Sequence, residues 1–408
     1  MVPNGWVSHT LSSVAKVIDC KHRTPKYVEA GIPLVSPGTI KWGALDLFSP
    51  VKRVTKEEYL SLMDHCTVEK GDLVMSRNQS VGIASYVESN DPFVLGQDTV
   101  LIKPLNTDSK FIYYKLQSDI VQRLILKIAG GSTFSRINLA DIRKLRVDIP
   151  PLHEQNKISQ ILSTWDKAIT TTEQLLANSQ QQKKALMQQL LTGKKRLLDE
   201  SGLKFKSDWK PIPLKSMGKI VSGGTPDTSN KEFWDGSVKW LTPTDVTALK
   251  SRYVLNTKRT ISELGVSNSS ATMLPKGSLM VCTRATIGAL AISTSDICTN
   301  QGFKNLVPNK KFDVEFIYYL LSFFPNEMIS KASGSTFLEL SKKDFEKIEL
   351  SCPTLDEQQK IATVLSVADQ EIDTLKQKLS QLNQEKKALM QQLLTGKKRT
   401  VSIKDEEK

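Results

Sequence analysis

The sequence has little cysteine and lacks the long apolar runs of membrane proteins. Its 408 residues include five cysteines, and this odd number contains no CxxC pair. Such usage fits a reducing compartment better than a secreted disulfide framework. No basic segment followed by an apolar run opens the chain, and no stretch approaches eighteen consecutive apolar residues. We therefore expect a cytoplasmic protein that makes no use of a membrane.

The common motifs of enzyme active sites are also missing. No GxGxxG, GxxxxGK[ST] or HExxH pattern occurs, and the histidines are too scattered for a metal site: His9, His22, His65 and His153. The segment NDPFV (90–94) approximates the Asn-Pro-Pro-Phe signature of amino-methyltransferases. However, Asp91 replaces a proline and no glycine-rich cofactor segment accompanies it. We predict a turn before a strand here, and no catalytic residue or metal in the chain.

What the chain does have is positive charge. It carries 56 Lys and Arg against 43 Asp and Glu, for a net charge of +13. A balance of this kind suits a polyanionic partner, most often nucleic acid. Charge alone does not identify the partner, because many basic proteins bind no nucleic acid.

The dominant feature of the sequence is an internal repeat. The segment KKALMQQLLTGKKR occurs at 183–196 and again, unchanged, at 386–399. At the same offset of 203 residues, PPLHEQNKI (150–158) matches PTLDEQQKI (353–361). The two copies of GSTF (131–134 and 334–337) keep this offset without a gap. Further back small gaps appear but the order of landmarks persists: FIYYKL and FIYYLL, KGDLVMSRNQSVG and KGSLMVCTRATIG, and Trp6 and Trp209. The chain is two copies of one unit whose first part has diverged.

The undiverged part of each copy is predicted to be a long helix. Residues 154–191 contain no proline or glycine, and their apolar residues fall at heptad spacing, as they do in the second copy. This pattern predicts a coiled coil. Prolines precede both segments, and Gly193 and Gly396 follow them, as expected of helix ends. Because the first helix leads to the second repeat, pairing requires the two helices to be antiparallel.

The diverged parts combine short β-type runs, broken by Gly, Pro, Asn and Asp, with a helical patch at 110–129. We therefore predict an α+β fold with two globular domains, separated by two long antiparallel coiled-coil helices and related by a pseudo-twofold repeat. The expected boundaries are 1–152 for the first domain, 153–204 for the central helix, 205–354 for the second domain and 355–408 for the last helix and tail.

A polar loop in each diverged part is the best candidate for reading bases. SRNQSVG (76–82) and TRATIG (283–288) each follow a β-type run and end at glycine. Arginine can read guanine, and Asn or Gln can read adenine. We take Arg284 as the counterpart of Arg77, in a loop one residue shorter. A polar turn with an incidental arginine is an equally good interpretation. The candidates are Arg77, Asn78, Gln79, Ser80, Arg284 and Thr286.

Other residues are candidates for the DNA backbone. The repeated GSTF suggests phosphate contacts by hydroxyl groups, although a structural hairpin explains it as well: Ser132, Thr133, Ser335 and Thr336. Lys41 lies beside Trp42 in TIKWG, a mixture that suits nucleic acid, but tryptophan is more often core. The basic clusters 194–196 and 397–399 suit either phosphates or solvated helix ends.

These features together resemble a known family, the specificity (S) subunits of type I restriction–modification systems. The resemblance depends on the alternation of variable part and helix, on PPLHEQNKI and KKALMQQLLTGKKR with their echoes, and on the paired loops. It covers the chain from Trp6 to Arg399. It implies that each variable part is a target recognition domain reading one half of a bipartite, asymmetric site on double-stranded DNA.

The resemblance also implies partners and cofactors. The helices would dock methyltransferase (M) subunits, two in number, which bring S-adenosylmethionine, and a restriction (R) subunit, which uses ATP and Mg²⁺, would complete the nuclease. No catalysis or cofactor is implied for this chain. The helix residues that we assign to docking are Leu186, Met187, Leu190, Leu191, Leu389, Met390, Leu393 and Leu394.

Two alternatives remain. A coiled-coil scaffold with two protein-binding heads fits the architecture but gives no reason for the charge. A methyltransferase in its own right would need a cofactor fold that the sequence does not show. Steep salt dependence of DNA affinity would separate a DNA-binding protein from the scaffold.

Overall fold

The computed structural model describes residues 2–49, 52–129, 136–334 and 338–400. It divides into two compact units. Unit 1 consists of residues 1–173 together with 377–408, and unit 2 consists of residues 174–376. Each unit therefore contains the diverged part of one repeat together with portions of both long helices. The predicted boundaries instead give each long helix a region of its own, 153–204 and 355–408.

Unit 1 is built on three small sheets, in the orders β1-β9, β2-β8-β5-β6 and β4-β3-β7. Their strands are β1 (Val7–Thr10), β2 (Ala15–Asp19), β3 (Ile32–Val35), β4 (Arg53–Val54), β5 (Leu73–Ser76), β6 (Ala84–Tyr86), β7 (Val94–Leu95), β8 (Thr99–Pro104) and β9 (Arg146–Ile149). The helices are α1 (Leu11–Val14), η1 (Pro37–Thr39), α2 (Lys56–Met63), α3 (Ser109–Gln117), α4 (Asp119–Ala129) and α5 (Leu139–Arg143).

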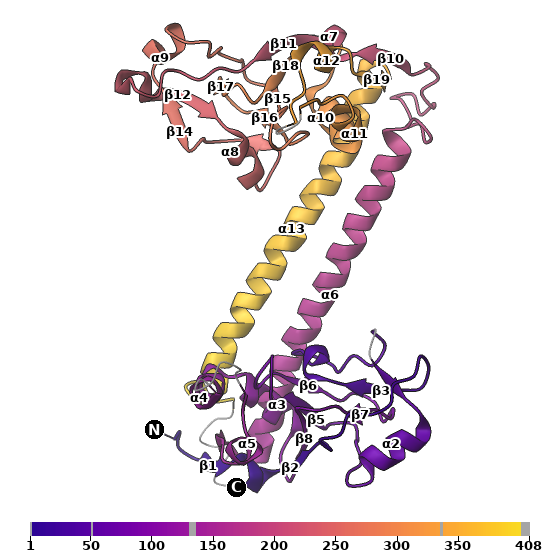
Figure 1. The fold of residues 1–408 in the computed structure, drawn as a ribbon, viewed down its shortest axis with the longest axis vertical. Helices are drawn as coiled ribbons and strands as arrows, with labels where there is room; N and C mark the ends of the chain where they lie inside the picture. The colour runs from indigo at the N-terminus through magenta and orange to yellow at the C-terminus, as the bar shows by residue number, and fades with distance from the viewer. Residues whose placement is uncertain (1, 50–51, 130–135, 335–337, 401–408) are drawn as a thin grey trace. The chain divides into compact units, whose positions relative to one another are not determined.

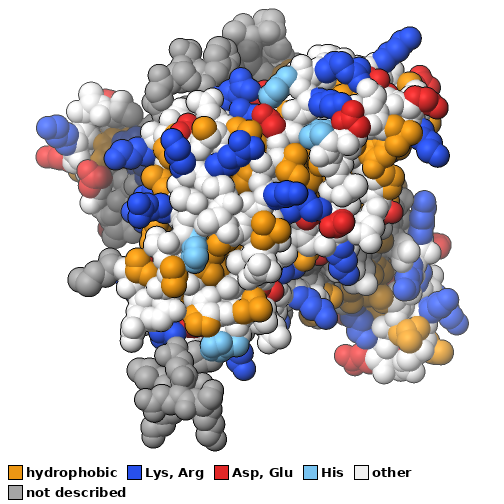
Figure 2. All heavy atoms as spheres, turned by 90° about the horizontal axis from the view of Figure 1, so that it is seen from below, with side chains coloured by type: hydrophobic (Ala, Val, Ile, Leu, Met, Phe, Trp, Pro, Cys, Tyr) orange, Lys and Arg blue, Asp and Glu red, His pale blue; other side chains and the backbone are white. Residues whose placement is uncertain are grey.

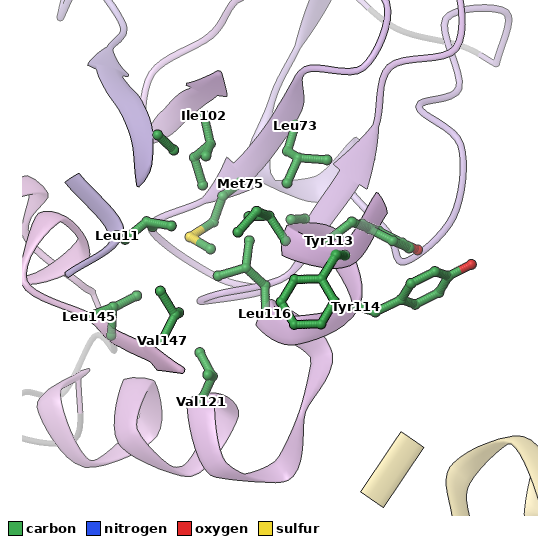
Figure 3. Packing of buried hydrophobic residues seen from close by; sticks show 14 of the residues in the cluster. Leu11, Leu73, Met75, Ile102, Tyr113, Tyr114, Leu116, Val121, Leu145 and Val147 are labelled. Atoms are coloured by element: carbon green, nitrogen blue, oxygen red, sulfur yellow. The ribbon is translucent and has the colours of Figure 1, made fainter. Parts of the chain in front are cut away.

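The core of unit 1 lies between the four-stranded sheet and helices α3 and α4. Leu73, Met75 and Ile102 on the sheet pack with Leu116 and Val121 on the helices (Figure 3). All five are at most 1% exposed, and burial of each such side chain contributes roughly 1.5–3 kcal/mol. This layer of helices on a sheet confirms the predicted α+β class.

Unit 2 repeats this plan with sheets β10-β19, β11-β18-β15-β16-β13 and β14-β12-β17. Its strands are β10 (Lys210–Pro213), β11 (Gly218–Ser222), β12 (Trp234–Leu241), β13 (Tyr253–Val254), β14 (Arg259–Ile261), β15 (Leu279–Val281), β16 (Leu290–Ser293), β17 (Cys298–Thr299), β18 (Lys304–Pro308) and β19 (Glu349–Cys352). The helices are α7 (Leu214–Met217), η2 (Lys231–Phe233), α8 (Pro243–Ala248), α9 (Glu263–Ser267), α10 (Val314–Phe323), α11 (Asn326–Ile329) and α12 (Lys342–Glu346).

The two predicted long helices are present as α6 (Leu152–Leu190) and α13 (Leu355–Leu393), of 39 residues each. They lie next to one another and run antiparallel within each unit (Figure 1). In unit 1, Asp166 of α6 pairs with Lys386 of α13 at 2.5 Å. In unit 2, Lys183 of α6 pairs with Asp369 of α13, also at 2.5 Å. Since each partner is shifted by 203 residues, the second pair is the repeat equivalent of the first.

Glycine ends both helices, as predicted. Gly193 and Gly396 have positive φ values of 68° and 66°, a backbone conformation that side chains disfavour. Each lies against the tryptophan that begins the diverged part of its unit, Trp209 for Gly193 and Trp6 for Gly396. None of the helices that the structure describes is long and apolar enough to span a membrane.

Candidate nucleic-acid interface

The first predicted reading loop connects β5 to β6 in unit 1, and it corrects one assignment. Arg77 is buried, with only 5% of its surface exposed. Its guanidinium donates to Asp19 at 2.7 Å and to the backbone carbonyl of Ile137 at 3.2 Å. The burial of Arg77 contradicts the prediction that it reads a base, because the side chain is enclosed and its Nε and Nη1 groups donate inside the domain.

The second loop connects β15 to β16, and it corrects the alignment of the two repeats. The backbone of Arg77 donates to Asp98, whereas Thr283 donates to Gly302 in the matching position. The backbone carbonyls of Arg77 and Thr283 in turn accept hydrogen bonds from the N–H groups of Ile137 and Leu340. Both donors lie in the segment that follows GSTF.

Two further observations fix this register. The bridge partner of Asn78 is Arg136, and that of Arg284 is Glu339, its repeat equivalent. Gln79 and Ala285 are the non-glycine residues of these loops with positive φ, at 58° and 63°. Arg284 is therefore the counterpart of Asn78 rather than of Arg77, and the two loops have the same length.

The tips of the two loops share one backbone conformation but carry different side chains. Unit 1 presents Asn78, Gln79 and Ser80, of which Gln79 is exposed and the other two half-buried. Unit 2 presents Arg284, Ala285 and Thr286, all exposed. The left-handed conformation at the second tip residue is strained for a side chain, and strain of this kind clusters at functional sites. We call these two sets of three residues the tip triplets.

Of the other predicted contacts, Lys41 is exposed, and its backbone exchanges hydrogen bonds with Ser85 of β6. The four GSTF hydroxyl residues, Ser132, Thr133, Ser335 and Thr336, lie outside the described residues. Arg136 and Glu339, which lie shortly after these segments, are the bridge partners of Asn78 and Arg284. The contact of any of these residues with DNA stays a prediction.

The structure also brings together polar residues that sequence reasoning missed. In unit 1 the exposed Gln97 donates to Thr24 at 3.2 Å. In unit 2 the same two residue types are bonded in the opposite direction, with the hydroxyl of Thr225 donating to the side-chain oxygen of Gln301. Each glutamine precedes the residue whose carbonyl accepts from the base of its loop. Both threonines precede proline, and this repeated Thr-Pro was the available signal. It was missed because the intervening segments differ in length.

A cation lies over an aromatic ring in each unit. Lys52 Nζ is 4.4 Å from the ring centre of Tyr27, and the Arg259 guanidinium carbon is 3.7 Å from that of Trp234. The two cations hold the same place in their sheets. The backbone of Lys52 accepts from Leu34 on β3, and Arg259 pairs with Trp240 on β12. Both are exposed, and of the residues described no carboxylate lies within 4 Å of either charge.

Positive charge is spread over the surface rather than gathered in one patch on the face that Figure 2 shows. Lys and Arg side chains lie across this face with acidic side chains between them (Figure 2). Net charge therefore supplies a general attraction to a polyanion. Local arrangements must supply any specificity.

The residues assigned to docking partner subunits are instead part of the cores. Leu190, Leu191, Leu393 and Leu394 are at most 1% exposed. Leu186, Met187, Leu389 and Met390 are half-buried and pack on the same two clusters. The prediction that the four buried leucines form a docking surface is wrong, because the helix end of one repeat completes the core beside the other repeat's domain.

The repeated segment KKALMQQLLTGKKR (183–196 and 386–399), called the repeated block from here on, makes matching ion pairs in the two units. Arg196 binds both carboxylate oxygens of Glu357 at 2.6–2.7 Å, and Arg399 binds both oxygens of Glu154 at 2.8–2.9 Å. Both carboxylates are fully buried. A bidentate guanidinium is well suited to a buried carboxylate.

One group of possible metal ligands occurs among the described residues, formed by Asp19, Cys20 and His22. Asp19 already pairs with Arg77 at 2.7 Å and with His22 at 3.1 Å. A guanidinium on the carboxylate competes with a cation, so we assign no metal here. All five cysteines are free. Burial raises the pKa of Cys282 to about 12 and that of Cys298 to about 11. Such thiols are inert.

Comparison with known proteins identifies the family. A model described as the type I restriction modification DNA specificity domain matches residues 3–178 and again residues 206–384. The chain therefore belongs to this family, which confirms the resemblance seen in the sequence. Its members named below are specificity subunits, so the chain is of a DNA-recognition class rather than a catalytic one.

Two curated relatives come from Methanocaldococcus jannaschii. The putative MjaX specificity subunit is 26% identical over 426 residues, covering 97% of this chain and 94% of that protein. The MjaIX specificity subunit is 37% identical over 178 residues, which covers 42% of this chain and 40% of that protein.

Solved structures show the same fold. The S subunit from M. genitalium aligns over 96% of this chain and 99% of its own, with a TM-score of 0.61 and 19% identity. The HsdS subunit from Thermoanaerobacter tengcongensis aligns over 97% and 98%, with a TM-score of 0.50 and 17% identity.

Proposed function

We propose that this chain selects a bipartite, asymmetric DNA site for a type I restriction–modification complex, with each unit reading one half. The observation that carries the proposal is the pair of tip triplets. They share one strained backbone, with φ of 58° at Gln79 and 63° at Ala285, but differ in every side chain. Amides suit adenine and arginine suits guanine, so the two tips are matched to different bases.

The sheets support recognition over catalysis. The largest sheets have the orders β2-β8-β5-β6 and β11-β18-β15-β16-β13, and most of their neighbours are antiparallel. A doubly wound parallel sheet, which binds cofactors at its switch point, has a different order. We infer that the S-adenosylmethionine, ATP and Mg²⁺ of the complex are held by partner subunits in the cytoplasm.

Docking of the methyltransferase subunits, two in our proposal, falls to the exposed side of the repeated block. Core packing explains why the buried leucines of the block are identical in its two copies. It does not explain why the exposed residues are identical as well. They are Lys184, Ala185, Gln188 and Gln189, with their equivalents Lys387, Ala388, Gln391 and Gln392. Two copies of one subunit would need two copies of one surface. A restriction subunit would join the same complex.

An exchange of tip triplets tests the reading of half-sites. The triple variant Arg284→Asn, Ala285→Gln, Thr286→Ser gives unit 2 the tip of unit 1. We expect the methylated motif, mapped by long-read sequencing of the host genome, to change in one half only. Deletion of the gene should abolish that motif. The conservative variant Thr286→Ser alone is the control. A motif that stays the same in both halves after the triple exchange would sink the proposal.

A coiled-coil scaffold with two protein-binding heads is the second candidate. It predicts little DNA affinity at any salt concentration. For the proposed function, affinity of the purified complex should fall steeply between 50 and 200 mM salt, at about 0.9 in log–log slope for each phosphate bound.

A further inference from the structure

Beside each tip triplet, the structure places a second set of polar residues that is alike in the two units. We call these sets the flanking clusters. The cluster of unit 1 consists of Thr24, Tyr27, Lys52 and Gln97, and that of unit 2 consists of Thr225, Trp234, Arg259 and Gln301. Each contains one Thr–Gln hydrogen bond and one cation over an aromatic ring.

In unit 1 the cluster surrounds a shallow depression of about 290 Å³. Tyr27, Lys52 and Gln97 line it together with Ser36 and Thr39. The side-chain oxygen of Gln79 lies beside Gly38 in the same short helix as Thr39, since a Cβ on Gly38 would be 3.6 Å from it. The tip triplet and the flanking cluster therefore adjoin.

In unit 2 a series of contacts connects the flanking cluster to the tip triplet. Arg259 lies over Trp234 and within 5.5 Å of the ring centre of Trp240. The indole of Trp240 donates to Gly224 at 2.9 Å, next to Thr225. Thr225 bonds to Gln301, whose neighbour Gly302 accepts from the residue before Arg284. Contacts and chain neighbours therefore connect the cation of Arg259 to the tip triplet of unit 2.

The aromatic rings orient the cations without neutralising them. A ring under a guanidinium or ammonium fixes its position and leaves its N–H donors directed outward. Neither cation has a carboxylate within ion-pair distance in the part of the chain that the structure describes. An exposed and pre-oriented positive charge, with amide and hydroxyl groups next to it, suits an anionic oxygen such as a phosphate.

Because the two flanking clusters are alike, we expect them to bind a part of DNA that is alike in both half-sites. Under the proposed function the two units read different bases, and the tip triplets differ accordingly. Both clusters keep one chemistry, with Thr and Gln unchanged and a cation over an aromatic ring, although Lys52 and Tyr27 are replaced by Arg259 and Trp234. A chemistry kept in both units matches what both half-sites share, which is the sugar–phosphate backbone. We propose that Lys52 with Gln97, and Arg259 with Gln301, each bind a backbone phosphate next to the bases that the tip reads. This inference rests on the proposed function and assigns contacts within it.

Salt-dependent binding of the purified complex of this chain with its methyltransferase subunits tests the assignment. The variants Lys52→Gln and Arg259→Gln should each weaken binding about five- to tenfold near 0.1 M salt and lower the log–log salt slope by about 1. The loss should be equal on the methylated motif and on a duplex with one altered half-site. Lys52→Arg should restore binding, and Lys157→Gln on the exposed side of α6 is the matched control.

The remaining outcomes contradict the inference in distinguishable ways. Unchanged affinity and slope for both variants would mean that the cations only cover their rings. A loss confined to the intact motif would mean that Lys52 or Arg259 reads a base. If the unsubstituted complex shows neither salt-dependent binding nor preference for its motif, the proposed function itself fails.

Discussion

The two units of this chain are alike where the long helices meet the domains and different where the loops end. At the helix junctions the buried ion pairs are repeated, as Arg196–Glu357 and Arg399–Glu154. At the tips the backbone is repeated but the side chains are not. Interior contacts constrain both members of a pair, because a change in one leaves the other unsatisfied. The tip side chains are less constrained: the ion pair of Arg284 with Glu339, at 4.0 Å, joins two half-exposed side chains.

The junctions differ at one informative position. Lys115 of α3 in unit 1 is 3% exposed and donates to the backbone carbonyl of Leu394 at 2.7 Å, at the end of the block. Leu320 of α10 occupies the same place in unit 2. Burial lowers the pKa of Lys115 to about 8. Unit 1 therefore carries the cost of a buried cation at a position where unit 2 uses an apolar side chain.

The largest expected effect comes from breaking the buried junction pairs. Arg399→Ala leaves Glu154 buried without its cation, and Arg196→Ala does the same to Glu357. Each should destabilise its own unit by about 2–3 kcal/mol, somewhat less than for a fully buried pair because both arginines are partly exposed. Hydrogen exchange measured segment by segment locates the loss.

The controls are Lys397→Ala and Lys194→Ala, exposed neighbours in the same helix ends. They should change exchange little. Faster exchange in the opposite unit, or equal loss in both units from either variant, would show that the junctions are not separate supports.

The second effect concerns Lys115 and has a sign set by pH. Its pKa is about 8 in the folded state and near 10.5 when unfolded, so the unfolded state binds more protons between these values. Stability should therefore rise with pH from about 8 to 10.5, and below pH 8 the full cost of the buried charge is present. Lys115→Leu should remove that rise and stabilise the protein at pH 7 by about 1–2 kcal/mol, after loss of the hydrogen bond to Leu394.

The reverse substitution sharpens this test. Leu320→Lys places a cation at the matching position of unit 2 and should destabilise the protein at pH 7. Urea unfolding at pH 7, 9 and 10 measures both variants. A pH dependence that is the same in Lys115→Leu as in the unsubstituted protein would refute the assignment of the rise to this lysine.

The sequence predicted the repeat, the α+β class and both long helices, because heptad spacing and flanking glycines are local signals. It did not predict which side of the block is buried. Leu190 and Leu191 look like any helix seam, and only the fold shows that they complete the core of a domain.

The register of the loops was also missed. The sequence prediction matched Arg77 to Arg284 because both are arginine. The positive φ values of Gln79 and Ala285 match these two residues instead, which shifts the alignment by one. The flanking clusters assemble residues far apart in sequence, and the repeated Thr-Pro marks only one residue of each.

The smallest expected effect compares the ion pairs between α6 and α13. Lys386 is the salt-bridge partner of Asp166 in unit 1, whereas Asp369 in unit 2 is held by Arg252 at 3.2 Å as well as by Lys183. Removal of Lys386 should therefore cost about 1 kcal/mol, and removal of Lys183 a few tenths, since half-exposed pairs contribute little and Asp369 keeps a cation. Urea unfolding of Lys386→Met and Lys183→Met measures the difference, and adding Arg252→Met to the second variant should raise its cost above that of the first. If the single variants lose equal stability, Arg252 does not substitute for Lys183, and the two units are alike at this contact as well.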